Sequence, residues 1–498
     1  MADSLPHLPI LNALLHHSQG NYRGFHTPGH HSGQGIHPDL ADAWRITGLQ
    51  LDLSEIPGLD NLAAPTAIIA QAQNLAAETF GAEKTWFLIN GSTVGISAAI
   101  MATCGPGDRI LVPRTIHQSV LSGMILAGAR PALITPDYDP VWGLALPLNS
   151  EQIQAALKQY PDTKAVLVIS PTYDGLCPDL VQIVEVVHQQ NIPLIVDEAH
   201  GSHFQFHPQL PMSAIQAGAD VVIHSTHKTL SAFTQAAMLH HQGRRVSPTR
   251  ISQCLRVLQS SSPSYLLLAS LDVAREQMAT EGESLWASVL GLVDDLNQAL
   301  DNLPSAIQLS AEFLPAGVTK DPTRVTLGTW PLKITGYRAD DYLTQSHHLI
   351  GELPTLNYLT FLLGLGHTRA DINALVQSWG QLIETMAENY GQKYLYTQEW
   401  QTLNQMGQIS PSLGPITTPI VDPRTAFLGL QQQVPQAQAI NQISAEWICP
   451  YPPGIPWLFP GELITEPIMA QLLAIQQAGG IIAGASDPTL QTLQIIDA

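Results

Sequence analysis

The amino-acid sequence predicts an α/β protein, in which a mostly parallel β-sheet with helices on both faces is followed by a smaller α+β domain. Short, continuously apolar strands alternate with helical stretches between about residues 60 and 245, which is typical of a parallel sheet buried on both faces. The chain of 498 residues is longer than the roughly 100–200 residues that usually share one hydrophobic core. A proline-marked break near residues 304–315 then separates this pattern from mixed strands and helices.

The expected elements of the large domain follow one another regularly. Its first helix, residues 66–80, begins after Pro65 and ends at Gly81, the usual start and stop residues of a helix. Further helices are expected at residues 96–104, 117–127, from Ser150, at 249–258 and at 265–281. Strands are expected at residues 85–89, 109–112, 131–135, 165–170, 193–197 and 221–224.

The remaining chain divides into an arm and a second domain. Residues 1–50 are rich in His, Gly and Pro, and we expect an arm with one short helix at residues 8–15. The large domain then covers residues 51–310, and an α+β domain covers residues 311–498, with a strand at 324–327 and a helix at 371–388. In the loop from Tyr451 to Glu462, repeated prolines exclude a regular helix or a central strand.

Composition limits the possible partners and location. The sequence contains 21 Lys and Arg residues and 41 Asp and Glu residues, so the net charge is −20. This negative charge argues against a nucleic-acid partner and fits a small cationic substrate. Charged residues make up only 12%, so part of the surface is expected to be buried between subunits. The four cysteines lie far apart, which favours reduced, buried thiols. No secretory signal or membrane span is evident, so we expect a cytoplasmic protein.

The strongest local signal is Ser225-Thr226-His227-Lys228, directly after an expected strand. A lysine at the carboxyl end of a parallel strand lies where open α/β sheets bind ligands. Burial there would lower its pKa and make the neutral amine a nucleophile toward carbonyl groups. Ser225 and His227 would offer hydrogen-bond donors to a phosphate beside it. The alternative is an ordinary surface lysine on a loop.

Asp197 ends another apolar strand, 31 residues before Lys228. Such a carboxylate could bind a metal, cap the next segment, or pair with a pyridinium nitrogen. Beside a strand-end lysine and phosphate-binding groups, the pyridinium pair is the economical interpretation. His200 and His203 could suggest a metal, but no carboxylate stands at ligand spacing, so no metal site is expected.

Two further segments follow strands. In Asn90–Gly95, small residues would let backbone N–H groups approach an anion at a helix start, and Ser92 and Thr93 add hydroxyl groups. An ordinary capped turn is equally compatible with that segment. His117 could lie flat on a planar cofactor, act as an acid or base, or simply begin a helix.

In chain order these segments resemble the fold-type-I pyridoxal-phosphate enzymes, and more narrowly the bacterial ornithine/lysine/arginine decarboxylase family. The resemblance covers nearly the whole chain. Its most specific elements are the S-T-H-K, D-E-A-H-G and Y-P-P-G-I-P sequences, which end at Lys228, Gly201 and Pro456. Other segments that carry it are Thr27–His30, Asp52–Glu55, Asp60–Leu62, Asn90–Thr93, His117, Pro171–Gly175 and Ser262–Tyr265.

The resemblance implies a pyridoxal 5'-phosphate site. Lys228 would carry the cofactor covalently, Asp197 would pair with its pyridine nitrogen, and His117 would stack on its ring. His200 would lie near it. The expected phosphate ligands are Ser92, Thr93, Ser225 and His227, and Ser262 from the 260–262 segment of a neighbouring subunit. That last contact implies a homo-oligomer, at least a dimer, with shared active sites.

The resemblance also implies decarboxylation of a basic L-amino acid to agmatine or a diamine, as in polyamine biosynthesis, with arginine slightly ahead of lysine and ornithine. Glu462, Asp52 and Glu55 are the candidates for binding the distal cation of the substrate. Gln118 departs from the lysine usual after the stacking histidine, and the chain resembles the short form of the family. An aminotransferase or lyase of the same fold, or a catalytically silent regulatory relative, is the alternative.

Overall fold

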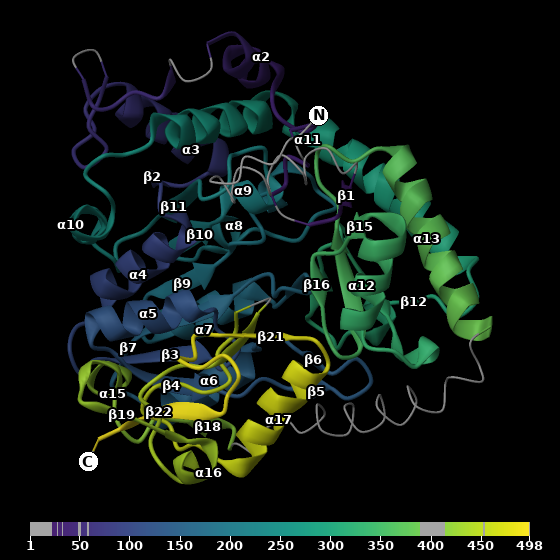
Figure 1. The fold of residues 1–498 in the computed structure, drawn as a ribbon. Coiled ribbons are helices and arrows are strands. Elements are labelled where there is room, and N and C mark those ends of the chain that lie inside the picture. Colours follow the sequence, from purple (N-terminus) through teal and green to yellow (C-terminus); the bar gives the residue numbers. More distant parts are fainter. Residues whose placement is uncertain are drawn as a thin grey trace, which may run out of the picture.

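The computed structural model of the chain describes residues 22–26, 28–31, 33–47, 51–56, 59–388, 414–451 and 454–497. The helix expected at residues 8–15 lies outside the described residues, as do Thr27, Pro452 and Pro453 of the family-like segments. Figure 1 shows a large central sheet, a second sheet beside it, and a C-terminal section in yellow along the lower edge.

An eight-stranded sheet forms the centre of the molecule, in the order β18-β4-β3-β7-β9-β10-β11-β2. Five adjacent strands, from β4 to β10, pair in parallel, which confirms the expected mostly parallel sheet. Strands β11 and β18 run in the direction opposite to the other strands of this sheet. The strands are β2 (Lys84–Leu88), β3 (Arg109–Pro113), β4 (Arg130–Ile134), β7 (Thr163–Ile169), β9 (Leu194–Asp197), β10 (Val221–His224), β11 (Ala237–His241) and β18 (Ile416–Thr417).

Helices cover both faces of this sheet because its strands are apolar on both sides (Figure 1). Along β3, Ile110 and Val112 belong to one buried cluster, whereas Leu111 belongs to the other. The first cluster includes α4 (Gly91–Thr103), α5 (Gln118–Ala127) and α10 (Pro248–Leu258). The second includes α3 (Ile68–Phe80), α6 (Ser150–Gln159), α7 (Leu180–Gln189) and α11 (Tyr265–Asp301).

Helix α11 is longer than expected, because it continues for 20 residues past the predicted end at residue 281. Its second half buries Trp286, Val289 and Val293 at helical spacing, and this packing continues the helix through Gly282. A Cβ atom at Gly282 would lie 3.3 Å from Phe206, so the glycine allows that ring to approach the helix. The prediction of a helix end there was wrong.

A second, four-stranded antiparallel sheet follows α11, in the order β12-β14-β17-β16. Its elements are β12 (Ile307–Gln308), β14 (Arg324–Gly328), α12 (Gly336–His347), β16 (Leu353–Pro354), β17 (Tyr358–Leu362) and α13 (Arg369–Glu388). The first described residues join this part, because β1 (Arg23–Gly24) pairs in parallel with β15 (Leu349–Ile350). Helix α2 (Pro38–Thr47) follows β1.

The C-terminal section contains two small antiparallel ribbons and adds β18 to the edge of the large sheet. Its elements are α15 (Pro423–Leu428), β19 (Gln431–Pro435), α16 (Gln436–Ala439), β20 (Cys449–Tyr451), α17 (Glu466–Gln477), β21 (Ile481–Ala483) and β22 (Thr492–Ile496). The remaining short elements are β5 (Tyr138–Asp139), β6 (Leu144–Ala145), β8 (Leu176–Cys177), α8 (Ala214–Ala217), α9 (Thr226–Thr229) and β13 (Thr319–Lys320). Within the described ranges, no helix is long and apolar enough to cross a membrane.

Four buried polar side chains form a hydrogen-bonded line that runs from the end of β9 across β10 and β11 to β2. Glu198 contacts His224 at 2.7 Å, and His224 contacts His240 at 3.1 Å. His240 in turn contacts the Thr85 hydroxyl at 2.8 Å. Strand β11 was not predicted, because its last two residues are histidines. His240 is buried with the partners of this line, and His241 is buried with its Nε2 atom donating to the Val246 carbonyl at 2.9 Å. All four cysteines are also buried, and none forms a disulfide.

Candidate active site

Lys228 lies just beyond the carboxyl end of β10, in the short helix α9. Its Nζ atom is 3.0 Å from Nε2 of His200 and 5.8 Å from the centre of the Tyr173 ring. Burial lowers the pKa of the Lys228 amine, although the nearby Asp197 carboxylate opposes that shift. A buried amine of this kind has the character of a nucleophile.

Asp197 is brought beside Lys228 by strand pairing, because β9 and β10 are parallel neighbours and Asp197 lies opposite Ile223. Its Oδ1 atom accepts a hydrogen bond from the Ala199 backbone N–H at 3.2 Å. Burial raises the pKa of its carboxyl group to about 6, and the charge of Lys228 limits the rise. The carboxyl ends of two neighbouring strands thus place a carboxylate near an amine.

His117 is the N-cap of α5, and its Nδ1 atom accepts the Ser119 backbone N–H at 3.2 Å. Burial, aided by the charge of Lys228, lowers the pKa of its imidazole to about 4. The proline-rich loop comes close to this ring, because a Cβ atom at Gly454 would lie 3.4 Å from Nε2 of His117. Gln118 binds the same loop through its backbone N–H, which donates to the Gly454 carbonyl at 3.1 Å.

Hydroxyl groups from two distant segments meet near the start of α4. The Ser225 hydroxyl donates to Oγ of Ser92 at 2.7 Å. Ser92 lies in the first turn of α4, where backbone N–H groups have no acceptor within the helix. Among the described residues, the buried Thr226 hydroxyl has no hydrogen-bond partner. Free donors at a helix start fit an anion such as a phosphate.

His227 connects α9 to β11 and to the arm. Its Nδ1 atom donates to the Ala236 carbonyl at 2.9 Å, which leaves Nε2 for another partner. Its own carbonyl accepts the Gly29 N–H at 2.9 Å. Gly29 permits this approach, since a Cβ atom there would lie 2.8 Å from the Thr229 backbone. Burial lowers the pKa of His227 to about 4.

Four expected site residues do not contact Lys228 within the described part of this single chain. Thr93, Ser262 and Asp52 are exposed, and Thr93 follows Ser92 in the first turn of α4. The backbone N–H of Ser262 donates to the Ser260 hydroxyl at 3.1 Å. Glu55 accepts hydrogen bonds from Asn61 at 2.6 Å and from the Leu62 N–H at 2.9 Å. The roles expected for these four residues therefore stay predictions.

Glu462 already forms an ion pair within the chain. Its two carboxylate oxygens lie 2.5 and 2.8 Å from the guanidinium nitrogens of Arg114, and the Phe459 N–H donates to it at 3.0 Å. The Arg114 guanidinium also lies over the Phe459 ring, 5.0 Å from its centre. Direct binding of a substrate guanidinium by Glu462, as expected from the sequence, would have to replace this pair.

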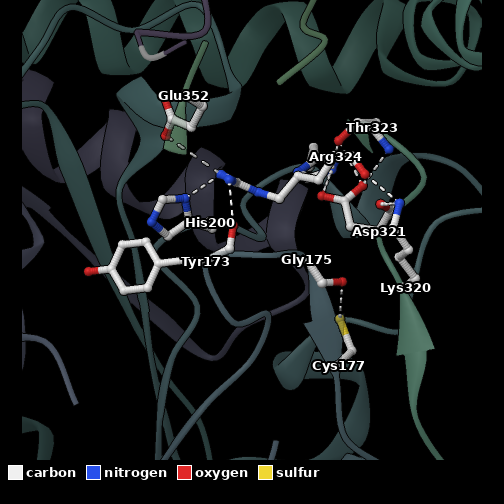
Figure 2. A network of polar contacts seen from close by, with 10 residues as sticks. Tyr173, Gly175, Cys177, His200, Lys320, Asp321, Thr323, Arg324 and Glu352 are labelled. Atoms are coloured by element: carbon white, nitrogen blue, oxygen red, sulfur yellow. Dashed lines mark hydrogen bonds and ion pairs between the residues drawn. The ribbon is translucent and has the colours of Figure 1, made fainter. Parts of the chain in front are cut away.

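Arg324 is a site residue that the sequence interpretation missed. It opens β14, is fully buried, and reaches from the second sheet to His200 and Tyr173 (Figure 2). Its Nη1 atom donates to the Tyr173 carbonyl at 2.7 Å, and its Nη2 atom lies 4.0 Å from Glu352. A charged residue at the start of an apolar strand was the available signal, because such a charge is buried only with partners.

A cavity of about 210 Å³ lies where the large sheet, the second sheet and the C-terminal section meet. Its walls include Trp142, Tyr173, Tyr358 and Trp457. Asp174 also lines it, and burial raises the pKa of that carboxyl group to about 6 despite a hydrogen bond from Tyr358. Aromatic rings with a carboxylate suit a cationic ligand. Within the described part of the chain, no cluster of three or more His, Cys, Asp or Glu could hold a metal.

Comparison with known proteins finds two matching family models. Residues 8–335 match the Orn/Lys/Arg decarboxylase major domain, and residues 416–486 match the Orn/Lys/Arg decarboxylase C-terminal domain. The chain is 36% identical to the arginine decarboxylase of Bacillus subtilis over 490 residues, which cover 98% of this chain and 97% of that protein. It is 27% identical to a lysine decarboxylase of Pseudomonas aeruginosa, over 94% of this chain and 75% of that protein.

The fold is also that of solved structures. The lysine decarboxylase of Francisella novicida matches with a TM-score of 0.76 and 22% identity, over 98% of this chain and 81% of that one. At this identity the match concerns the fold alone. It confirms the expected fold class, a mostly parallel sheet with helices on both faces and a separate C-terminal part.

Proposed function

Because the chain belongs to the Orn/Lys/Arg decarboxylase family, we propose that it binds pyridoxal 5'-phosphate through Lys228 and converts L-arginine to agmatine. It is an amino-acid decarboxylase whose substrate class is the basic amino acids. The observation that carries the cofactor assignment is the position of the buried Lys228 amine, 3.0 Å from His200 and beside Asp197 at the end of the neighbouring strand.

The side chains present fit this cofactor. The hydroxyls of Ser92 and Ser225 and the unpartnered Thr226 hydroxyl suit a phosphate at the start of α4. We also assign Thr93, His227 and, from a neighbouring subunit, Ser262 to the phosphate. When bound, pyridoxal phosphate supplies an electron sink for the charge that decarboxylation leaves on the α-carbon.

The protein would supply attachment, orientation and proton placement. The Lys228 amine would hold the cofactor covalently, and the Asp197 carboxylate would keep a proton on its pyridine nitrogen. His117, held as the N-cap of α5, offers the face of its ring for stacking. The proline-rich loop near Gly454 and the aromatic cavity keep water away from the reacting atoms.

Arginine is placed ahead of lysine and ornithine because of the relatives' names. The arginine decarboxylase of Bacillus subtilis is 36% identical over nearly the whole chain, whereas the Pseudomonas aeruginosa lysine decarboxylase is 27% identical. The net charge of −20 also favours a cationic substrate. In the cavity, Asp174 is a buried carboxylate among aromatic rings, an environment that suits a distal guanidinium.

We further propose an oligomeric state, a domain organisation and a cellular location. The active unit is at least a dimer, in which the exposed Ser262 segment completes the site of a neighbouring chain. We propose residues 1–50 as an arm, residues 51–310 as the cofactor-binding domain, and residues 311–498 as an α+β domain with the proline-rich active-site loop. The enzyme would work in the cytoplasm, in polyamine biosynthesis.

Borohydride reduction and product analysis test this function. Reduction of the purified enzyme should fix the cofactor on Lys228, as read by peptide mass spectrometry, and the half-buried Lys320 should stay unmodified. Incubation with arginine, lysine and ornithine should yield agmatine fastest. An adduct on another lysine would refute the cofactor assignment. A keto-acid product would indicate an aminotransferase, and equal turnover of leucine or glutamine would refute the substrate class.

A further inference from the structure

Arg324 and His200 come from different parts of the molecule and contact each other (Figure 2). His200 also contacts Lys228. Arg324 opens β14 of the second sheet, whereas His200 follows β9 of the large sheet. Nη2 of Arg324 contacts Nδ1 of His200, and Nε2 of the same ring is 3.0 Å from Nζ of Lys228. The imidazole therefore links the arginine to the lysine.

The contact with Arg324 determines which ring nitrogen of His200 carries the hydrogen. A guanidinium has five N–H donors, no acceptor, and stays protonated. Nδ1 of His200 must therefore accept, so the hydrogen of the neutral ring is on Nε2. Burial and the charge of Arg324 lower the pKa of His200, which keeps the ring neutral.

The Nε2–H group of His200 then determines the protonation state of the Lys228 amine. An ammonium group has three N–H donors and no lone pair, so it cannot accept from Nε2–H. A hydrogen bond at 3.0 Å between these two nitrogens requires a neutral Lys228 amine. That form has the lone pair that a nucleophile needs.

We propose that Arg324 is a positioning residue that acts through His200, fixing the tautomer whose Nε2–H faces Lys228 and thereby holding the lysine as a neutral amine. This inference rests on the proposed function, in which Lys228 attacks a carbonyl group. Arg324 is not available to bind substrate in this arrangement, because its guanidinium is fully buried and already contacts His200 and the Tyr173 carbonyl.

Polar contacts of Asp321 hold the start of β14 in place, as a positioning role of Arg324 requires (Figure 2). Oδ1 of Asp321 accepts the Thr323 N–H at 2.9 Å and the Thr323 hydroxyl at 2.7 Å. The other oxygen of Asp321 lies 3.2 Å from Nε2 of His203 on the large-sheet side. Because Asp321 and His203 are fully buried, the backbone that carries Arg324 is anchored to the loop that follows β9.

Several charged and titratable groups face Lys228, and they act in opposite directions. Burial and Arg324 lower the pKa of its amine, whereas Asp197 and Glu352 raise it. The rings of His117, His200 and His227, like the amine itself, have lowered pKa values because of burial. The charge of Arg324 thus acts on Lys228 directly as well as through His200, and an experiment must separate the two effects.

Competitive labelling of the apoprotein measures the Lys228 amine without any enzyme activity. Acetic anhydride reacts with neutral amines, so labelling of the Lys228 peptide against pH gives the midpoint at which the amine loses its proton. Arg324→Met frees the imidazole to present an unprotonated Nε2 to the lysine ammonium. We expect the midpoint to rise by about one pH unit or more, the equivalent of one charge-assisted hydrogen bond.

A double-mutant cycle separates the tautomer effect from the charge effect. In a His200→Phe background only the through-space charge remains, so Arg324→Met should shift the Lys228 midpoint by at least about half a unit less than it does with His200 present. Arg324→Lys, which keeps the charge and N–H donors, should retain most of the wild-type midpoint. If Arg324→Met does not fold, a midpoint in Arg324→Lys that rises by about one pH unit despite the retained charge and donors would overturn the proposal. Equal shifts in both backgrounds would overturn the proposal.

Arg275→Gln is the matched control, because Arg275 is also a buried arginine but pairs with Asp272 on α11. It should leave the Lys228 midpoint unchanged, and a shift as large as that of Arg324→Met would also overturn the proposal. Failure of the proposed function is recognised separately, since it removes the borohydride-fixed adduct from Lys228 and leaves the labelling cycle of the apoprotein intact.

Discussion

Arg114 and Glu462 form a bidentate ion pair between the end of β3 and the proline-rich loop, with nitrogen–oxygen distances of 2.5 and 2.8 Å. Both side chains are nearly buried, at 7% and 10% exposure. Arg114 also donates to the Trp457 carbonyl at 3.0 Å. The pair therefore fixes the end of the loop to the large sheet at the rim of the aromatic cavity, which both Arg114 and Trp457 line.

Glu462→Gln should destabilise the protein by about 3 kcal/mol, because it leaves the Arg114 charge buried without a counter-ion. Denaturant unfolding measures the loss, and Glu466→Gln, at the exposed start of α17, should cost far less. An unchanged stability together with a raised KM for arginine would mean that Glu462 binds substrate instead.

Asp197→Asn should keep the fold and lower kcat by about 10²-fold or more, roughly 2.7 kcal/mol, because an amide cannot keep the pyridine nitrogen protonated. Steady-state kinetics at saturating cofactor measure this. Asp220→Asn is the control, since Asp220 is a buried carboxylate paired with His188 and Arg245 away from Lys228. It should reduce stability with little change in kcat. A loss much below 10²-fold in Asp197→Asn would point to a structural role.

Cofactor affinity of the apoprotein should fall as the pH falls through about 6, where the buried Asp197 carboxyl group takes up a proton. Below that pH the proton must be lost before the carboxylate can pair, so affinity should fall up to about tenfold per pH unit. The sign for folding is opposite, because a raised carboxyl pKa means that the apo fold loses stability as this group ionises. Titration of pyridoxal phosphate at several pH values tests this, and Asp197→Asn should lack the decline.

Lys228→Ala and Ser262→Asp should complement each other when the two inactive proteins are unfolded and refolded together. In a mixed dimer with shared sites, one site receives both wild-type residues, so roughly a quarter of all sites should recover. Activity of the mixture against each variant alone measures this. No recovery, in mixtures that sedimentation shows to contain dimers, would place Ser262 outside the neighbour's site.

Asp60→Ala should lower the free energy of unfolding by about 2 kcal/mol, because the Asp60 carboxylate accepts backbone N–H groups from the start of α3. Its acceptor contacts include Thr66, Ala67 and Ile69 at 2.7–3.1 Å. Although burial raises it, these bonds bring the pKa of Asp60 to about 2. Thermal unfolding measures the loss, and an unchanged midpoint would show that water can replace the carboxylate.

The order of strands and helices in the large domain followed from local patterns. Gly81 ends α3 in the left-handed conformation that its position indicated, with φ of 73°. The parallel strands were evident because each is apolar on both faces. Strand β11 was missed because its histidines look polar in isolation, and the side-chain partners of His240, Thr85 and His224, come from two other strands.

Local sequence patterns also predicted only part of the candidate site. Lys228, Asp197 and His117 could be found because each directly follows a strand, and parallel strands place such positions at one edge of the sheet. Arg324 was missed although a charge at the start of an apolar strand suggested a buried partner, because its contact with His200 joins residues 124 positions apart. Pairing between Arg114 and Glu462 was hidden for the same reason.

The hydrogen-bonded line from Glu198 to Thr85 has a consequence for strand alignment during folding. His240 lies directly opposite Thr85, and a slip of one residue would turn every side chain of β11 to the other face of the sheet. Glu198 and His224 would then be buried without the third member of the line, at a cost of about 1–3 kcal/mol for each unsatisfied group. The polar line therefore selects one register of β11 between β10 and β2 where apolar side chains alone would tolerate several.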